Sequence, residues 1–265
     1  MVDFSHSEQY TLSIRVSADG FCFTVHRPDR VGEYAYMPFR VESSMPIPAN
    51  LKRAKEQLPM LSHTYGHVDL LLPDSLCTIV PVEYCTADNA RDLFLQNFPF
   101  TTAHQDVMQS PVIEGGYVLL YAVDKSVLKW ANELFPHVKV QPSLQPVLTF
   151  FLKERSKAFV VNLHERKMDA LYVDNGNLLY QNTFDNTSAD DCLYFMLGIW
   201  NSLGLSQEDD HLLLAGHTPG MSEIRASLTR FIQHVEVLRP ADVFHGSELA
   251  RLSGVPFDIQ CLVSM

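Results

Sequence analysis

The chain has 265 residues, of which 46% are hydrophobic and 19% charged, so it can bury a large core and is too apolar for a disordered polymer. Its formal net charge of −11 disfavours nucleic acid and anionic membranes as partners, because like charges repel. No apolar run approaches the roughly 20 residues of a membrane-spanning helix, and residues 1–9 lack the basic and apolar pattern of a secretory signal. These features predict a cytoplasmic protein.

The five cysteines are scattered along the chain and include no C-x-x-C pair. A disulfide scaffold or a zinc ribbon is therefore not expected. Each cysteine has apolar neighbours, which predicts buried small hydrophobic residues in a reducing compartment. The five are Cys22, Cys77, Cys85, Cys192 and Cys261.

Period-two alternation predicts three antiparallel strands at the start of the chain. Leu12, Ile14 and Val16 share one face of the first strand, and Asp19 with Gly20 forms a hairpin turn into the second. The later elements alternate between helices and strands. We expect a helix through 51–58, strands at 68–72 and 77–82, a helix at 88–98, an irregular stretch at 99–116, a strand at 117–123, a helix after Asp124, a strand at 138–140 and a helix at 144–155.

The pattern restarts at Lys157. Strands are expected at 158–163, 168–173 and 178–184, with an Asn175-Gly176 turn between the last two. Ser188 then begins a helix that Gly204 closes. Strands are expected at 211–215 and 235–238. Between them we expect a helix that starts at Thr218 and Pro219, with an apolar face of Met221, Ile224, Leu228 and Phe231.

The two halves share this order of elements, which predicts an α/β protein of two tandem half-domains. We assign residues 1–155 to the first half, with an insertion near 74–116, and residues 156–265 to the second. A mixed sheet of three antiparallel strands followed by alternating helices and strands is the order of the ribonuclease-H-like fold. Two in tandem resemble the actin-like ATPase superfamily of sugar kinases, heat-shock chaperones and actin. Residues 118–125 (VLLYAVDK) and 80–84 (VPVEY) also resemble a bacterial family of unknown function with this fold.

Active members of that superfamily end the first strand of each half with Asp-x-Gly, in which the Asp positions Mg²⁺ or water and the Gly admits phosphate. In this chain the matching positions hold Arg15 and Ser17 in the first half, and Asn162 and His164 in the second. The resemblance therefore implies a pseudo-enzyme. A two-metal nuclease is disfavoured for the same reason, and Asp69 and Asp74 are interpreted as cap and turn residues. No catalytic residue, metal ligand or cofactor is assigned.

One superfamily feature persists in the segment 212–220 (LLLAGHTPG). Gly216, His217, Thr218 and Gly220 resemble the Gly-rich loop that contacts adenosine between a strand and a helix. The alternative interpretation, which the residues favour, is that Gly216 makes a turn and Thr218 with Pro219 caps the helix, since no phosphate-gripping partner is evident.

Other groups are interpreted structurally. The eleven histidines are interpreted as surface residues, or as core residues whose hydrogen bonds are satisfied. Two aromatic groups are taken as core, namely Phe94, Phe98 and Phe100, and Phe150 with Phe151.

The leading functional hypothesis is a non-catalytic protein-interaction or scaffold module whose partner is another protein. The alternatives are a nucleotide-dependent phosphotransferase or ATPase with displaced catalytic groups, and a small-molecule sensor that uses the cleft between the halves.

Overall fold

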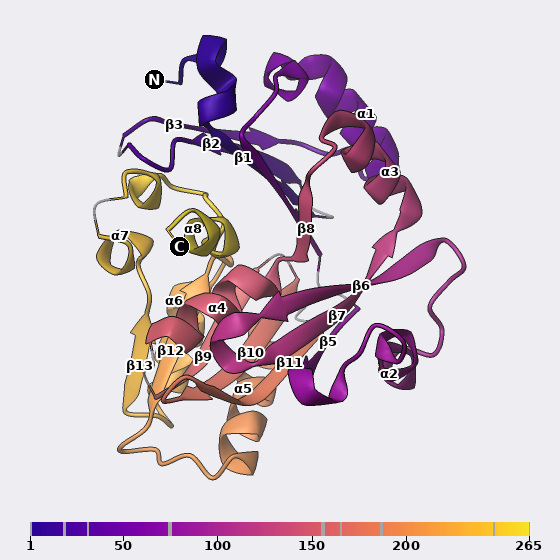
Figure 1. Cartoon of the computed structure of the whole chain (residues 1–265). Coiled ribbons are helices and arrows are strands. Elements are labelled where there is room, and N and C mark those ends of the chain that lie inside the picture. Colours follow the sequence, from indigo (N-terminus) through magenta and orange to yellow (C-terminus); the bar gives the residue numbers. More distant parts are fainter. Residues whose placement is uncertain are drawn as a thin grey trace. The chain divides into compact units, whose positions relative to one another are not determined.

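The computed structural model describes residues 2–17, 20–30, 32–73, 76–154, 157–164, 166–185, 188–245 and 247–264. Contacts divide the chain into two compact units. The first comprises residues 1–145 and 246–249, and the second comprises residues 146–245 and 250–265. Each unit contains a five-stranded mixed sheet (Figure 1). No helix within the described ranges is long and apolar enough to cross a membrane.

The sheet of the first unit has the order β3-β2-β1-β4-β8. β2 pairs antiparallel with both β1 and β3, so the three expected N-terminal strands are confirmed. On its other side β1 pairs parallel with β4. The predicted turn residue Asp19 lies outside the described residues. The strands are β1 (Thr11–Val16), β2 (Phe21–His26), β3 (Tyr34–Phe39), β4 (His67–Leu72) and β8 (Lys139–Pro142).

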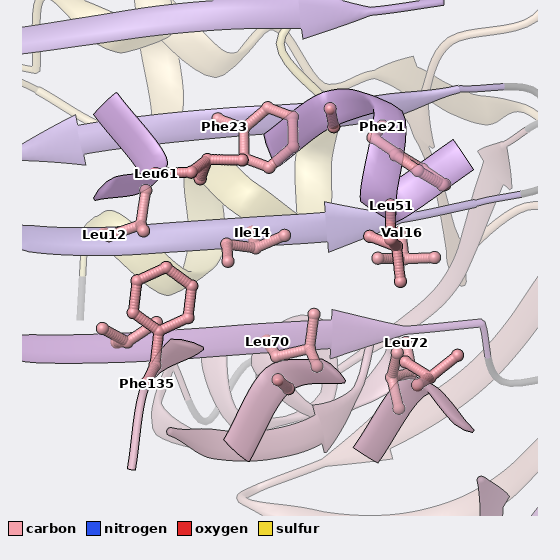
Figure 2. Close-up of a cluster of buried hydrophobic side chains, with 14 of the residues drawn as sticks. Leu12, Ile14, Val16, Phe21, Phe23, Leu51, Leu61, Leu70, Leu72 and Phe135 are labelled. Atoms are coloured by element: carbon pink, nitrogen blue, oxygen red, sulfur yellow. The ribbon is translucent and has the colours of Figure 1, made fainter. Parts of the chain in front are cut away.

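One face of this sheet carries the hydrophobic core of the first unit. Leu12, Ile14 and Val16 alternate along β1 and point to the same side, as Figure 2 shows. Two helices contribute to this core, α1 (Ile47–Gln57) and α3 (Lys125–Leu134). Asp124 caps α3 as predicted, accepting a hydrogen bond from the Ser126 N–H at 2.7 Å. Short 3₁₀ turns precede β1 and follow α1, at Phe4–Gln9 and Pro59–Ser62.

An insertion between β4 and α3 forms a separate three-stranded antiparallel sheet of order β5-β7-β6. Its elements are β5 (Cys77–Pro81), a 3₁₀ turn at Val82–Tyr84, α2 (Ala90–Asn97), β6 (Gln105–Val112), a turn at Ile113–Gly115 and β7 (Tyr117–Asp124).

Two predictions for the insertion are wrong. The stretch 99–116 is not irregular, because β6 occupies 105–112 of it. β6 is an edge strand, and a half-exposed edge accommodates polar residues and Pro111, which hid its pattern. Phe94 is fully buried as expected, but Phe100 is 93% exposed and is not a core residue.

The sheet of the second unit has the order β11-β10-β9-β12-β13, equivalent to that of the first. The Asn175-Gly176 turn is confirmed: both residues have positive φ, 50° and 81°, as a tight hairpin requires. The strands are β9 (Ala158–His164), β10 (Lys167–Asp174), β11 (Asn177–Asp185), β12 (His211–Gly216) and β13 (His234–Val237).

Helices cover the apolar face of this second sheet. The Ser188 hydroxyl caps α5 (Ala189–Ser202) by accepting the Asp191 N–H at 3.1 Å. The expected helix start at Thr218 is wrong, because α6 (Met221–Leu228) begins after Gly220. Phe231 lies beyond the helix and is 47% exposed, and Ile232 is buried instead.

The remaining helical segments lie mostly in this unit. They are α4 (Leu144–Glu154), α7 (Pro240–Val243), a 3₁₀ turn at Leu249–Arg251 and α8 (Phe257–Ser264). Phe150, Phe244 and Phe257 form an aromatic cluster with centroid distances of 5.2 to 6.4 Å. The sequence pattern did not predict α8, whose residues 257–261 are buried.

Candidate functional site

A buried carboxylate organises the polar face of the second sheet. Asp169 on β10 is fully buried. Antiparallel pairing places it opposite Asn162 on β9 and Thr183 on β11. Residues in register share a face, so these three side chains meet on the side of the sheet opposite the hydrophobic core. His164 reaches the same carboxylate from the end of β9.

Three side chains satisfy the two oxygens of Asp169. The Thr183 hydroxyl donates to Oδ1 at 2.9 Å, and the Asn162 amide donates to Oδ2 at 3.2 Å. His164 Nε2 lies 2.7 Å from Oδ2. Because an ionised carboxylate only accepts hydrogen bonds, this imidazole nitrogen carries the proton. The network therefore holds the side chains at both positions of the expected Asp-x-Gly motif inside the protein.

The network also keeps Asp169 ionised. Burial on its own raises the pKa of the Asp169 carboxyl, because a charge loses its hydration. The opposing charge of His164, followed by the hydrogen bonds from His164, Thr183 and Asn162, outweighs that effect and leaves the pKa below its ordinary value. The carboxylate is a fixed internal charge whose donors come from the protein itself.

Gly216, at the end of β12, lies directly against this network. Its φ is +82°, and a Cβ built on it would overlap the backbone carbonyl of Leu163 and come within 2.7 Å of Asn162 Oδ1. The N–H of His217 donates to the Leu163 carbonyl at 2.8 Å. Only glycine permits both the left-handed backbone and this close approach. The hydrogen bond from His217 and the close contact of Gly216 therefore hold the loop against the end of β9.

The rest of the predicted adenosine-type loop does not form the helix cap that the sequence suggested. Thr218 does not cap the helix, because the N-cap of α6 is Gly220, which has φ +82° and no side chain to offer. A Cβ built on Gly220 would lie 3.6 Å from Glu223 Oε2, so a carboxylate of the chain already lies beside the positive end of the helix. His217 is exposed and Thr218 half-buried. An added anion at this helix end would meet a like charge.

The corresponding positions of the first unit are also buried. Arg15 on β1 is 7% exposed and Ser17 is 3% exposed. The Ser17 N–H donates to the Gly20 carbonyl at 3.1 Å, which holds Ser17 between the end of β1 and the start of β2. Neither side chain is exposed to a ligand.

Asp69 is neither a cap nor a turn residue, and that prediction is wrong. It lies within β4, 5% exposed, where His67 Nε2 approaches it at 3.1 Å and the Gln141 amide donates at 3.3 Å. Burial raises the pKa of Asp69, and the charges of His67 and Lys139 only partly oppose this. Asp74, which was predicted with it, lies outside the described residues.

The first unit has a pocket of about 180 Å³ where the carboxyl ends of β1 and β4 meet. Ligands of α/β sheets commonly bind at such strand ends. The lining is mainly apolar, and its one charged residue is Asp124. The lining residues are Val16, Ile47, Leu72, Pro73, Leu76, Gln105, Ala122, Val123, Asp124 and Val127. This lining suits a small apolar group and disfavours phosphate.

The family model described as a protein of unknown function (DUF3822) matches residues 1–235. The chain belongs to this family. A crystal structure from Bacteroides thetaiotaomicron, of a protein with an actin-like ATPase fold and unknown function, is similar to this DUF3822 chain with a TM-score of 0.88. The two are 27% identical, over 100% of this chain and 99% of that one.

Two more distant structures are also similar to parts of this chain. The PilM–PilN type IV pilus biogenesis complex matches with a TM-score of 0.53, 14% identity and 92% coverage of both chains. The cytoplasmic domain of EpsL, an inner membrane component of the Vibrio cholerae type II secretion system, has a TM-score of 0.48 and 12% identity, over 96% of this chain and 92% of that one. A comparison with curated proteins finds no match. The DUF3822 chain is thus an α/β protein with the actin-like ATPase fold, as the sequence resemblance implied.

The residues of this DUF3822 chain do not fit the magnesium nucleotide that the name of the fold implies. Mg²⁺ requires oxygen ligands that are open to it, and phosphate requires exposed donors. The Asp169 carboxylate is fully buried and its oxygens are occupied by side-chain donors. No group of three or more His, Cys, Asp or Glu residues that could hold a metal occurs in the described segments.

Proposed function

We propose that this DUF3822 protein is a non-catalytic protein-interaction module built on the actin-like ATPase fold. The observation that carries the proposal is the Asp169 network. The positions at which an ATPase of this fold presents a carboxylate and a glycine hold Asn162 and His164, and both donate into a buried internal carboxylate. Those groups stabilise the sheet and leave no carboxylate there for metal-assisted phosphoryl transfer.

Large apolar side chains exposed on the insertion support a protein partner. Phe100 is 93% exposed, Tyr84 65% and Val82 53%, and all three lie in the segment between β5 and β6. Exposed aromatic residues are enriched where proteins bind one another. The five cysteines form no disulfide, which supports a reducing compartment such as the cytoplasm.

Site-specific photo-crosslinking tests the interaction. A photoreactive residue at Phe100 or Tyr84 is expected to capture one discrete host protein, which is then identified by mass spectrometry. Lys129 is a matched control, because its side chain is 77% exposed on α3 of the same unit. If positions 84 and 100 give no adduct beyond the control, the proposed partner surface is wrong. Mg-ATP turnover by the purified chain that Asn162→Ala or Thr218→Ala abolishes would refute the non-catalytic role.

The pocket of the first unit favours a second candidate, a small-molecule sensor. Its lining residues all belong to the first unit and suit a compact apolar ligand. Native mass spectrometry of the purified chain is expected to detect a bound molecule that the pocket-filling variant Ala122→Phe loses. Identical spectra for the two proteins would exclude this candidate.

A further inference from the structure

The edge strands of the three described sheets are protected unequally. β3, β5, β6 and β8 contain Pro38, Pro81, Pro111 and Pro142, respectively. Proline lacks an N–H and so discourages pairing by another strand. β13 is protected by its length of four residues. β11 is the exception: it is nine residues long and contains no proline, lysine or arginine.

β11 directs main-chain groups toward its outer side. It ends its sheet, and its register with β10 is continuous from Tyr180 to Asp185, with an irregularity just before Tyr180. The Thr183 N–H donates to Asn182 Oδ1 at 2.9 Å rather than to the ladder, so it points away from β10. Main-chain groups alternate in direction along a strand, so those of Gln181 also face outward.

The sequence of this segment is close to a palindrome. Residues 180–184 read Tyr-Gln-Asn-Thr-Phe, with an aromatic residue two positions on either side of Asn182 and a hydrogen-bonding residue one position on either side. An antiparallel copy centred on Asn182 would place Tyr180 opposite Phe184 and Gln181 opposite Thr183. The outward-facing groups of Gln181 and Thr183 would then pair with each other, which is the arrangement an antiparallel ladder needs. In this pairing the Thr183 N–H exchanges Asn182 Oδ1 for the Gln181 carbonyl of the second copy. No like charges face one another in this register.

We propose that β11 pairs with β11 of a second copy of the chain, forming an isologous dimer with a two-fold axis at Asn182. Self-complementarity of the segment is what a two-fold interface requires, and it selects a second copy over an unrelated peptide. The inference concerns the second unit and does not depend on the proposed function.

The surface beside the edge is aromatic and fits this partner. Phe184 stacks on Phe195 of α5 with a centroid distance of 4.7 Å, and Phe195 contacts Tyr194 at 5.5 Å. Tyr194 is 76% exposed. In the proposed dimer the Tyr180–Phe184 pairs lie on this same side of the sheet, so Tyr194 gains an apolar neighbour. The ladder is short, and the expected dissociation constant is on the order of micromolar.

Sedimentation velocity of the full chain, from about 1 to about 300 µM, tests the dimer around this affinity. Asn182 would face its own copy at a Cα separation of about 4.5 Å, so Asn182→Lys or Asn182→Asp places like charges together. Each variant alone is expected to weaken the dimer at least about tenfold. An equimolar mixture of the two is expected to form a one-to-one heterodimer. Glu236→Lys, an exposed change on the opposite edge β13, serves as the control and is expected to dimerise like the wild type.

A covalent test uses the same geometry. Asn182→Cys is expected to form an intermolecular disulfide under mild oxidation, because that separation lies within disulfide range, whereas Glu236→Cys is not. Circular dichroism verifies that each variant is folded. A wild-type chain that stays monomeric throughout the range overturns the proposal, and so does a dimer that Asn182→Lys and Asn182→Asp leave intact.

Discussion

Replacing Gly216 by alanine tests whether the close contact between Gly216 and Leu163 holds the adenosine-type loop, which follows β12, against the end of β9. Its φ of +82° costs a residue with a Cβ about 1 to 2 kcal/mol. The new Cβ would also overlap the Leu163 carbonyl, which belongs to rigid backbone, and forced overpacking costs a further 1 to 3 kcal/mol or so. We expect Gly216→Ala to lower the free energy of unfolding of the second unit by about 3 kcal/mol.

Gly204 provides a matched control. Its φ is +67°, yet nothing lies within 4 Å of a Cβ built there. Gly204→Ala should therefore show only the backbone strain, about 1 kcal/mol. Urea unfolding would be followed by the fluorescence of Trp200, which is 1% exposed in the second unit, in a Trp130→Phe background. Equal destabilisation by the two substitutions would refute the contact with Leu163 and leave the loop open to a ligand.

Three further predictions concern buried titratable groups. Asp169→Asn should destabilise the second unit by about 2 kcal/mol at pH 7, because His164 loses its charged partner. Since the folded pKa of Asp169 is lowered, the greater stability of the wild type in urea unfolding should disappear as the pH falls through 4 and below. A difference in stability that does not depend on pH would contradict this. Asp69→Asn should act oppositely and stabilise the first unit at pH 7, because burial raises the folded pKa of Asp69 and so disfavours its charged form. The gain should disappear as the pH falls below the ordinary pKa of an aspartate, and lower stability of the variant at pH 7 would refute this assignment. Burial, followed by the charge of His67, lowers the pKa of His26 to about 4. The first unit should therefore lose about 3 kcal/mol of stability between pH 6.5 and 4, as the unfolded chain takes up the proton, and urea titrations of His26→Asn that retain this loss would exclude His26 as its source.

The sequence predicted most strands and helices because their patterns are local. Alternation along β1 and the Asn175-Gly176 turn depend only on neighbouring residues, and both were confirmed. β6 escaped prediction because its half-exposed edge position permits polar residues and a proline. The start of α6 was misplaced because the Thr218-Pro219 pair offers a valid cap, and the approach of Gly216 to Leu163, which fixes the preceding loop, is a tertiary contact.

The candidate site was only half predictable for the same reason. Asn162 and His164 were identified by the positions they replace, but Asp169, which joins them, carries no motif of its own. Its role follows from strand register, which brings β9, β10 and β11 side by side. Asp69 was misassigned because a single aspartate in an apolar run gives no sign of its partner Gln141, 72 positions away.

The most direct test of the non-catalytic account is a titration of the purified chain with Mg-ATP and Mg-ADP, with thermal stability and phosphate release measured on the same samples. A nucleotide present at 100 times its dissociation constant would add about 2.7 kcal/mol of stability. The account predicts no stabilisation at millimolar nucleotide and no phosphate release above the protein-free rate. Stabilisation together with turnover that Asn162→Ala abolishes would contradict it.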